Sequence, residues 1–422
     1  MEIDPIVLDT FIADRAEVAF DFLERLVAVP STLGLEQEAQ EVVAAELERL
    51  GFQVERLAIA EAIAGDPHAG VPQGSYDGRY DLLAWRGGPG PVLQLNGHVD
   101  VVPAEEAELW SSPPFTAVRR DGWLYGRGAG DMKGGLAMAA LALDALAAAA
   151  PGLDPPLSFA SVIEEECTGN GTLAALRSGP LPAAAIALEP SDLELLLGGI
   201  GILWAEIAVR ARPDPATGSG RAVNPVERAL GVVAALRELE RELNESVDDP
   251  VLDGVPHPYT LNLGTFRAGN WPSSVPSVAR LGVRFGFPRQ WTAARAEARL
   301  REVVASAARS DPWLAEHPPE MRCTGFRAEG YALPADHPLA VAVADAHEQV
   351  NGSRPRAVVL GSTSDARYYC NQFAVPALCY GPRARNIHGV DEAVELASIV
   401  DGARVLARLL AAWPLGGFDG RR

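Results

Sequence analysis

The chain has 422 residues, 48% of them hydrophobic, and its formal net charge is −20 at pH 7. This length is typical of roughly two to three domains with large buried cores. The negative charge argues against nucleic acid and anionic membranes as partners, because both bind positively charged protein surfaces.

Two features of the sequence predict a cytoplasmic protein without a membrane span. No apolar run reaches the ~18 residues of a membrane-spanning helix, and the most apolar helical stretch, 136–150, is too short. The acidic start "MEIDPIVLDTF" lacks the basic residues of a signal peptide.

The cysteines give no sign of a disulfide framework. All four are widely spaced and form no CxxC pair, which favours reduced thiols over disulfides or a thiolate zinc site.

The N-terminal part of the chain alternates between helical and strand patterns. Helices are expected at 9–29, at 37–50, after Asp131 and at 172–177. Strands are expected at 54–59, 81–85, 91–95, 157–163 and 184–188, with an irregular loop over 61–78. This alternation predicts a three-layer α/β domain with a mainly parallel sheet.

From about residue 199 the pattern changes to the β-α-β-β-α-β order of a ferredoxin-like α+β domain. Its expected elements are 202–210, 225–243, 260–266, 279–287, 292–308 and 321–326. Beyond them the α/β pattern resumes, with helices at 339–350 and 392–410 and a strand at 375–380. We therefore predict a discontinuous α/β domain, 1–198 and 328–422, and an inserted domain, 199–327.

Acidic and imidazole side chains follow several of the predicted strands. His98 and Asp100 lie in "NGHVDVVP" at the end of a buried strand, where residues i and i+2 face the same way. Open parallel sheets bind ligands at the carboxyl ends of their strands. An Asp beside a ligating His can accept its second N–H, so Asp100 is expected to orient His98.

Four further segments offer carboxylates or imidazoles. Asp131 in "GRGAGDMKGG" precedes a helix and suits either a helix N-cap or a ligand shared by two cations. The run "VIEEECTGNG" contains Glu165 and Glu166 after a buried strand, where adjacent negative charges need a compensating cation. Glu189 follows the next strand, and His388 lies in a loop between a strand and a helix. Carboxylates with imidazoles suit Zn²⁺ or a similar cation.

At these motifs the chain resembles the dinuclear zinc amidohydrolase and peptidase family. That family includes acetylornithine deacetylase, succinyl-diaminopimelate desuccinylase, aminoacylase and carboxypeptidase G. The segments "VIEEECTGNG", "GNWPSSVPS" and "GSTSDARYY" look most like the acetylornithine deacetylase branch. The resemblance covers nearly the whole chain and includes the order of the domains.

The resemblance implies a role for each motif residue. His98 and Glu189 would bind one metal ion and Glu166 and His388 the other, with Asp131 bridging them. Glu165 would be the general base and acid. A shift of the acidic run by one residue would instead give these roles to Glu164 and Glu165. Two Zn²⁺ ions, or Co²⁺ or Mn²⁺, are the implied cofactors. The α/β domain would be the metal-binding catalytic domain, and the inserted domain, 199–327, would be a lid and dimerisation domain, called the lid domain below, through which a homodimer would form.

One position departs from the family pattern. The lid domain of the family carries a His that helps to polarise the scissile carbonyl, and the matching position here is Pro215. Proline has no side-chain donor, and the loss of one oxyanion donor can cost ~10²–10³ in rate.

The expected function is hydrolysis of the amide bond of an N-acyl amino acid or a similar small substrate. Arg284, Arg367 and Asn270 are candidates for binding a substrate carboxylate, although structural ion pairs would explain the arginines equally well. A dipeptidase or carboxypeptidase of the same family is the first alternative. The second alternative is a metal-binding homologue with reduced or no activity, because of Pro215.

Overall fold

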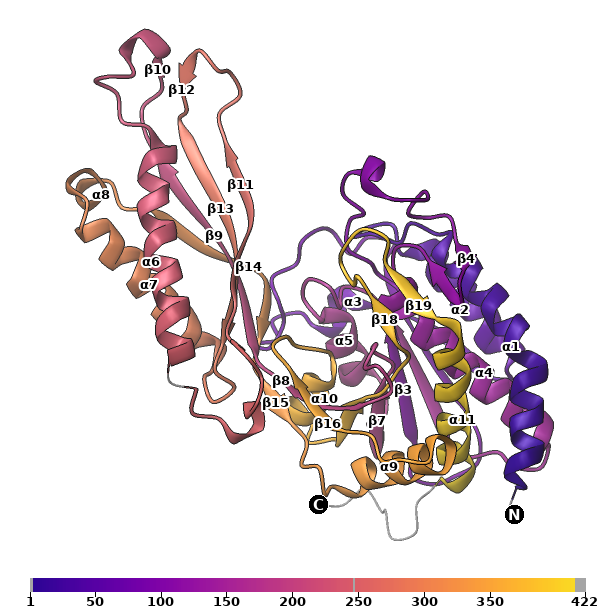
Figure 1. The fold of residues 1–422 in the computed structure, drawn as a ribbon. Coiled ribbons are helices and arrows are strands. Elements are labelled where there is room, and N and C mark those ends of the chain that lie inside the picture. Colours follow the sequence, from indigo (N-terminus) through magenta and orange to yellow (C-terminus); the bar gives the residue numbers. More distant parts are fainter. Residues whose placement is uncertain (1–2, 246, 414–422) are drawn as a thin grey trace.

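The computed structural model describes residues 3–245 and 247–413. The chain forms a three-layer α/β domain and an elongated second domain that projects from it (Figure 1). The expected fold class, a three-layer catalytic domain with an inserted ferredoxin-like domain, is confirmed.

The central sheet of the first domain has the strand order β1-β2-β6-β3-β7-β17-β8-β15, and β16 also pairs with β8. The strands are β1 (Gln53–Ala58), β2 (Tyr80–Arg86), β3 (Leu93–His98), β6 (Leu157–Val162), β7 (Ala184–Ala187), β8 (Leu195–Gly199), β15 (Tyr331–Ala332), β16 (Ala357–Leu360) and β17 (Ala377–Cys379). The four central strands, β6-β3-β7-β17, are parallel to one another, and antiparallel pairs flank them on both sides. Beyond these pairs, β16 is parallel to β8. The sheet is therefore mixed, and the expectation of a mainly parallel sheet holds for its centre.

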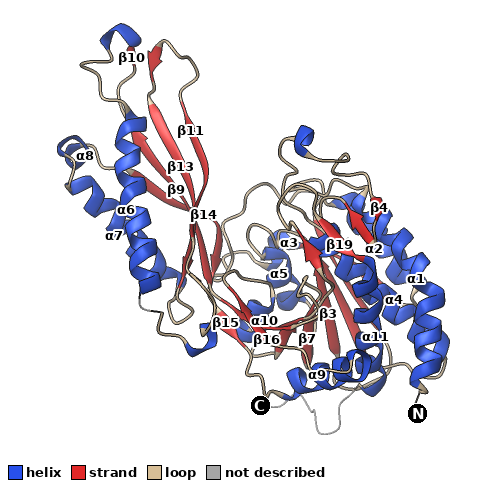
Figure 2. Ribbon diagram, in the orientation of Figure 1, coloured by secondary structure: helices blue, strands red, loops and turns tan. Residues whose placement is uncertain are grey.

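Helices cover both faces of this sheet (Figure 2). Helix α4 packs between α1 and α11 on one face, and α9 packs beside α11. Helices α5 and α10 lie on the other face, where Thr172 and Tyr369 hydrogen-bond to Asn96 and Gln94 of β3. The helices of this domain are α1 (Pro5–Val27), α2 (Gln37–Arg49), α3 (Ile59–Ala62), α4 (Gly134–Ala149), α5 (Asn170–Ser178), α9 (Pro338–Asn351), α10 (Ala366–Gln372) and α11 (Leu396–Ala412).

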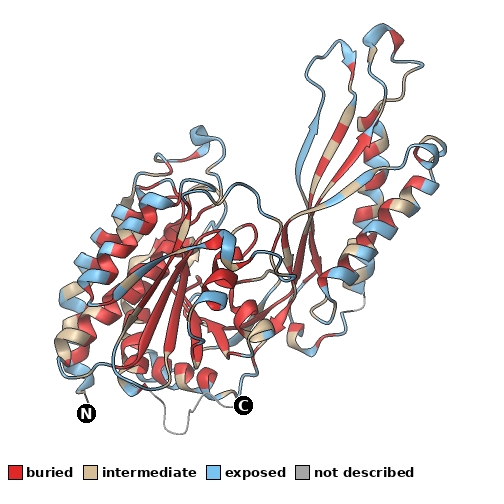
Figure 3. Ribbon diagram, turned by 180° about the vertical axis from the view of Figure 1, so that it is seen from behind, coloured by how far each residue is buried: buried red, intermediate tan, exposed pale blue. Residues whose placement is uncertain are grey.

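The helical stretch that includes α4 is longer than the sequence indicated. Among the described residues it is the one helix, Ala129–Ala149, whose length and apolar composition would allow it to cross a membrane, and 78% of its most apolar window is buried inside the protein. Its neighbours α1, α11 and the central sheet account for this burial, so it forms the middle of a helical layer. The strands of the central sheet are themselves buried over most of their length (Figure 3).

A small antiparallel sheet lies beside the central sheet and was not predicted. Its order is β18-β19-β5-β4, from β4 (Val118–Arg120), β5 (Trp123–Tyr125), β18 (Ala384–Arg385) and β19 (Ala393–Glu395). Strand β5 leads into a π-helical turn, Ala129–Lys133, and the hairpin of β18 and β19 encloses His388. These strands bring two distant polar segments together.

The lid domain has a four-stranded antiparallel sheet of order β11-β13-β9-β14, the ferredoxin-like arrangement. Its elements are β9 (Gly201–Arg210), α6 (Pro225–Glu245), β11 (Leu261–Ala268), β13 (Val278–Phe287), α7 (Ala293–Arg309), α8 (Pro312–Glu316) and β14 (Glu320–Ala328). Side chains alternate along β9: Leu203, Ala205 and Ile207 pack in the core with α6 and α7, and Ile202 and Trp204 face the other way. At its far tip, β10 (Asp214–Pro215) pairs with β12 (Ser274–Val275) (Figure 1).

The packing of α4 against the sheet predicts opposite effects of two Gly→Ala substitutions. A Cβ at Gly135 of α4 would lie 1.9 Å from the carbonyl oxygen of Leu188, whereas nothing lies within 4 Å of a Cβ at Gly231 of α6. Gly135→Ala should lower the free energy of unfolding by about 1–3 kcal/mol or more, because the helix must move off the sheet. Gly231→Ala should raise it by about 0.5–1 kcal/mol through helix propensity. Urea denaturation measures both, and equal effects would contradict the described contact.

Candidate metal centre and substrate pocket

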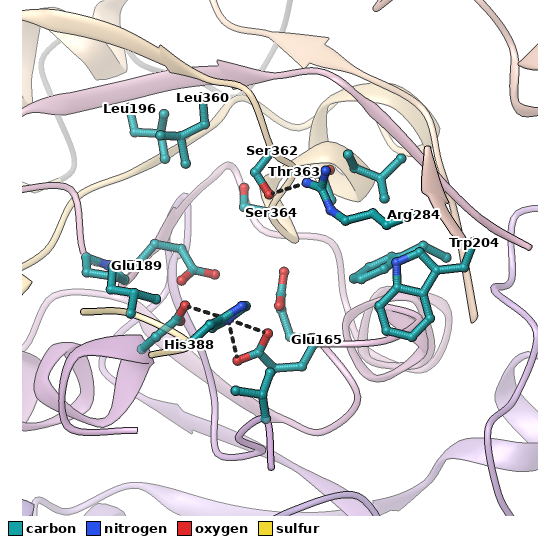
Figure 4. Close-up of a pocket in the computed structure, with 17 residues that line it drawn as sticks. Glu165, Glu189, Leu196, Trp204, Arg284, Leu360, Ser362, Thr363, Ser364 and His388 are labelled. Atoms are coloured by element: carbon teal, nitrogen blue, oxygen red, sulfur yellow. Dashed lines mark hydrogen bonds and ion pairs between the residues drawn. The ribbon is translucent and has the colours of Figure 1, made fainter. Parts of the chain in front are cut away.

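The residues that the sequence singled out meet at one edge of the central sheet. His98 ends β3, Glu165 and Glu166 follow β6, and Glu189 follows β7. These three strands are parallel neighbours, so their carboxyl ends lie side by side. Asp131 of the π-helical turn and His388 of the β18–β19 hairpin complete the cluster (Figure 4).

Asp131 lies between the two histidines. Its Oδ1 is 3.1 Å from Nε2 of His98, and its Oδ2 is 3.4 Å from Nε2 of His388. On one side His98 Nε2 is also 3.9 Å from Oε2 of Glu189, and on the other His388 Nε2 is 3.0 Å from Oε2 of Glu166. The geometry therefore contains two ligand sets that share one carboxylate. Asp131 is not the N-cap of α4, because that helix begins at Gly134 after Lys133.

Asp100 does not orient His98 in the expected way. Nδ1 of His98 lies 2.8 Å from the backbone oxygen of Asp100 and 3.6 Å from its carboxylate. The carboxylate instead accepts the backbone N–H groups of Glu165 at 3.2 Å and Glu166 at 3.1 Å. Asp100 thus fixes the acidic turn, while its own peptide group fixes the imidazole. Burial raises the pKa of this carboxyl to about 7.

The side chain of Glu164 points in a different direction from those of Glu165 and Glu166. Glu164 has φ of 62°, in the left-handed region, so the chain turns sharply there. Its carboxylate accepts hydrogen bonds from Arg79 at 2.7 Å, Tyr76 at 2.7 Å and Thr168 at 2.8 Å. Glu164 therefore points away from the cluster, and the alternative that gave the ligand and base roles to Glu164 and Glu165 is wrong.

Glu392 is a residue of this site that the sequence did not single out. Its Oε1 accepts the backbone N–H groups of Gly130 at 2.9 Å and Asp131 at 3.0 Å, and its other oxygen pairs with the buried guanidinium of Arg127. Glu392 therefore holds the turn that presents the Asp131 carboxylate. Its position four residues after His388, in an otherwise ordinary loop, was the only signal in the sequence.

Negative charge dominates the cluster. Burial lowers the pKa of His98, but the hydrogen bond to Asp131 and the charge of Glu189 raise it well above its ordinary value. The charge of Glu166 and the hydrogen bonds to Asp131 outweigh burial and raise the pKa of His388 to about 11. Burial and the charge of Glu189 raise the pKa of Glu165. His98 is buried, whereas the His388 side chain is 52% exposed. A set of carboxylates and imidazoles with these pKa shifts fits divalent cations, whose charge would compensate the carboxylates in place of the protons.

A pocket of about 400 Å³ opens from the cluster toward the lid domain. Arg284 of β13 lines its far end, as expected for a substrate-binding candidate (Figure 4). Arg367 does not line it: its guanidinium is buried behind the pocket and donates to the backbone oxygens of Thr168 and Ser364. Asn270 and Pro215 are exposed and lie near the tip of the lid domain, away from this pocket.

The chain is similar to known proteins over most of its length. The model of "Peptidase family M20/M25/M40" matches residues 94–412. Succinyl-diaminopimelate desuccinylase of Methylorubrum extorquens is 31% identical over 404 residues, covering 92% of this chain and 97% of the relative. N-formyl-4-amino-5-aminomethyl-2-methylpyrimidine deformylase of Bacillus subtilis (strain 168) is 28% identical, covering 89% and 88%. The dipeptidase Dug1p of Saccharomyces cerevisiae shares the fold, with a TM-score of 0.77, 16% identity and coverage of 97% and 98%.

The raised pKa values of the histidines predict that cation binding releases protons. The pKa of His98 is raised above its ordinary value and that of His388 is raised to about 11, which favours the doubly protonated imidazolium form of both. Each imidazolium must lose one ring proton before it can act as a ligand. Titration of the metal-free protein with Zn²⁺ in weak buffer should release at least two protons per chain, as measured with a pH indicator. In the His388→Ala variant at least one of these protons should be missing. Cation uptake without proton release would contradict the described ligand set.

Proposed function

Because this chain belongs to peptidase family M20/M25/M40, we propose that it hydrolyses the amide bond of an N-acyl amino acid or a similar small substrate. The chain is an enzyme, a metal-dependent amidohydrolase. The observation that carries the proposal is the position of Glu165, whose carboxylate lines the pocket beside the two ligand sets that share Asp131. One of its oxygens lies within 4.8 Å of ligand atoms of His98 and Glu189.

The donor set supports a pair of zinc ions, or Co²⁺ or Mn²⁺, as the cofactor. His98, Glu189 and Asp131 would hold one ion, and His388, Glu166 and Asp131 the other. Two imidazoles with carboxylates are ligands that these borderline cations accept. When bound, such a pair supplies Lewis-acid polarisation of a carbonyl group and lowers the pKa of a water molecule.

Glu165 is the residue that would move protons. Within the part of the chain that the structure describes, its carboxylate makes no hydrogen bond or ion pair with a side chain, unlike that of Glu164. Its oxygens are therefore free to accept a proton from a water molecule in the pocket. The oxygen of that water would add to the acyl carbon, and the C–N bond would break. The same carboxyl group would give the proton to the nitrogen of the departing amine, so that the products are a carboxylic acid and an amine.

The backbone around Glu165 keeps this proton carrier in place. Asp100 accepts the N–H groups of both Glu165 and Glu166, so the base and a ligand are fixed by the same carboxylate. Arg79, paired with both Glu36 and Glu164, anchors the start of the turn. The position of the base relative to the ligands is thus set by buried ion pairs and hydrogen bonds.

The alternatives differ in substrate or in activity. A dipeptidase or carboxypeptidase would use the same groups and is separated from a deacylase by assaying dipeptides against N-acyl amino acids. A metal-binding homologue without activity was suggested by Pro215, whose exposed ring offers no donor. The unpaired carboxylate of Glu165 in the pocket favours the active enzyme. A cytoplasmic location and a homodimer through the lid domain stay predictions from the sequence.

A matched pair of substitutions separates the base from the ligands. Glu165→Gln should lower kcat about 10³-fold or more, because the base is lost, and should leave the metal content unchanged. Glu166→Gln should lower the metal content as well as the activity, because a ligand is lost. Steady-state hydrolysis of N-acyl amino acids and elemental analysis of both variants give the answer. A Glu165→Gln enzyme with more than about a tenth of the original kcat would rule out the proposed role.

A further inference from the structure

The far wall of the pocket is one face of the lid sheet. Trp204 of β9 and Arg284 of β13 lie directly opposite each other in the strand register, so both side chains project from the same face. Ile202, two residues before Trp204, lies on this face too, and Phe326 of β14 completes the wall. The wall therefore combines apolar rings with a single guanidinium (Figure 4).

The indole of Trp204 is held in a fixed orientation. Phe326 meets it edge-on, with ring centroids 5.4 Å apart and an interplanar angle of 84°. On the neighbouring strand Gly325 has φ of 54°, and a Cβ there would lie 2.5 Å from a carbon of the indole ring. From behind, the Arg367 guanidinium lies 5.4 Å from the centre of the Phe326 ring. The aromatic wall is thus rigid before a ligand arrives, which reduces the entropic cost of binding.

Arg284 lacks a counter-charge. Its guanidinium donates to two hydroxyls, Thr260 Oγ1 at 3.1 Å and Ser362 Oγ at 3.2 Å, and no acid in the described part of the chain forms an ion pair with it. Burial lowers its pKa. A half-buried guanidinium that is positioned by neutral groups alone is well suited to pair with a carboxylate of a ligand.

The acids that line the pocket are all at the metal end. They are Asp131, Glu165, Glu166 and Glu189, and each is a proposed ligand or the proposed base. Among the described residues, His388 also lines the metal end, and the remainder of the lining carries apolar side chains, hydroxyls and Arg284. A positively charged group of a substrate would meet Arg284 here and would find no acid to pair with, so it would be desolvated without compensation.

We propose, on the basis of the proposed function, that the substrate carries an uncharged apolar group, an aromatic ring above all, next to its carboxylate. Trp204 and Phe326 contact the apolar group, Arg284 pairs with the carboxylate, and amino acids with cationic side chains are excluded. The apolar group belongs either to the side chain of the amino acid or to the acyl group. In either position the group presents an uncharged apolar surface to Trp204 and Phe326.

Two pairs of substrates test the proposal. N-acetylnorleucine and N-acetylornithine have side chains of the same length, and only the second carries an ammonium group. The zinc-loaded enzyme should prefer N-acetylnorleucine by about 100-fold or more in kcat/KM. N-acetylphenylalanine and N-benzoylglycine place the ring on the amino-acid side or on the acyl side, and the better of the two identifies the source. A preference for N-acetylornithine over N-acetylnorleucine would overturn the proposal.

Variants of the wall add a second test, which compares ratios of kcat/KM between substrates. Partial unfolding would lower all kcat/KM values together and would leave these ratios unchanged. Trp204→Leu should lower kcat/KM for the better aromatic substrate about tenfold or more relative to N-acetylalanine. Phe266→Leu is the matched control, because Phe266 is a partly exposed aromatic residue of the same sheet that does not line the pocket. Leu360→Asp, which adds an acid to the pocket lining, should shift the ratio toward N-acetylornithine. An unchanged ratio in both Trp204→Leu and Leu360→Asp would refute the assignment.

Binding to an inactive variant separates this proposal from the proposed function. Zinc-loaded Glu165→Gln enzyme should bind the better aromatic substrate at least tenfold more tightly than N-acetylornithine in isothermal titration calorimetry. If the wild type hydrolyses none of the N-acyl substrates but this binding order holds, the proposed function fails and the assignment of the wall stands. If hydrolysis occurs but the binding order is reversed, the wall assignment fails alone.

Discussion

The constraint on which the structure depends is electrostatic: several carboxylates must share one buried space. Asp131, Glu166 and Glu189 converge on two imidazoles, and Glu165 lines the same pocket. Like charges at this separation repel strongly where water is scarce, so the fold has to hold them in place until cations or protons compensate them. Hydrogen bonds and ion pairs around the cluster hold the segments that carry these carboxylates.

Three acids outside the ligand set do much of this work. Asp100 and Glu392 accept backbone N–H groups of the two segments that carry the ligands, and Glu164 pairs with Arg79. Each therefore stabilises a loop that would otherwise present unpaired amides or strained backbone. His388 itself has φ of 62°, a conformation that a non-glycine residue keeps only when its surroundings impose it. Some acidic side chains of this site are thus proposed metal ligands, and others stabilise the loops that carry those ligands.

The site residues that follow the buried strands could be predicted from the sequence. Buried apolar runs before His98, Glu165 and Glu189 indicated strands, and the rule for open parallel sheets placed their ends together. Periodicity also located the long helices and the lid elements to within a few residues. The short strands around Asp131 and His388 were missed, because two or three residues carry no readable alternation. The role of Glu392 depends on a hydrogen bond across 261 positions of sequence, which spacing cannot reveal.

Side-chain direction was the other limit of prediction from sequence. The HxD spacing placed Asp100 beside His98, but the backbone oxygen rather than the carboxylate faces the ring. Arg284 and Arg367 were equivalent in the sequence, yet one lines the pocket and the other supports Phe326 from behind. Asn270 lies in the lid domain with Arg284, at the opposite end of the long strands. Which end of a strand faces a site depends on tertiary packing, not on local pattern.

The junction between the domains has a mechanical consequence. Strand β8 of the central sheet passes into β9 of the lid through a single residue, Ile200, whose amide donates to the backbone oxygen of Ser362 at 2.8 Å. The side chain of Ser362 bonds to Arg284. The axis about which the lid could rotate therefore runs beside the pocket wall rather than far from it. A rotation of the lid domain about this junction would therefore displace Trp204 and Arg284 less than the distal tip, because both side chains lie near the axis.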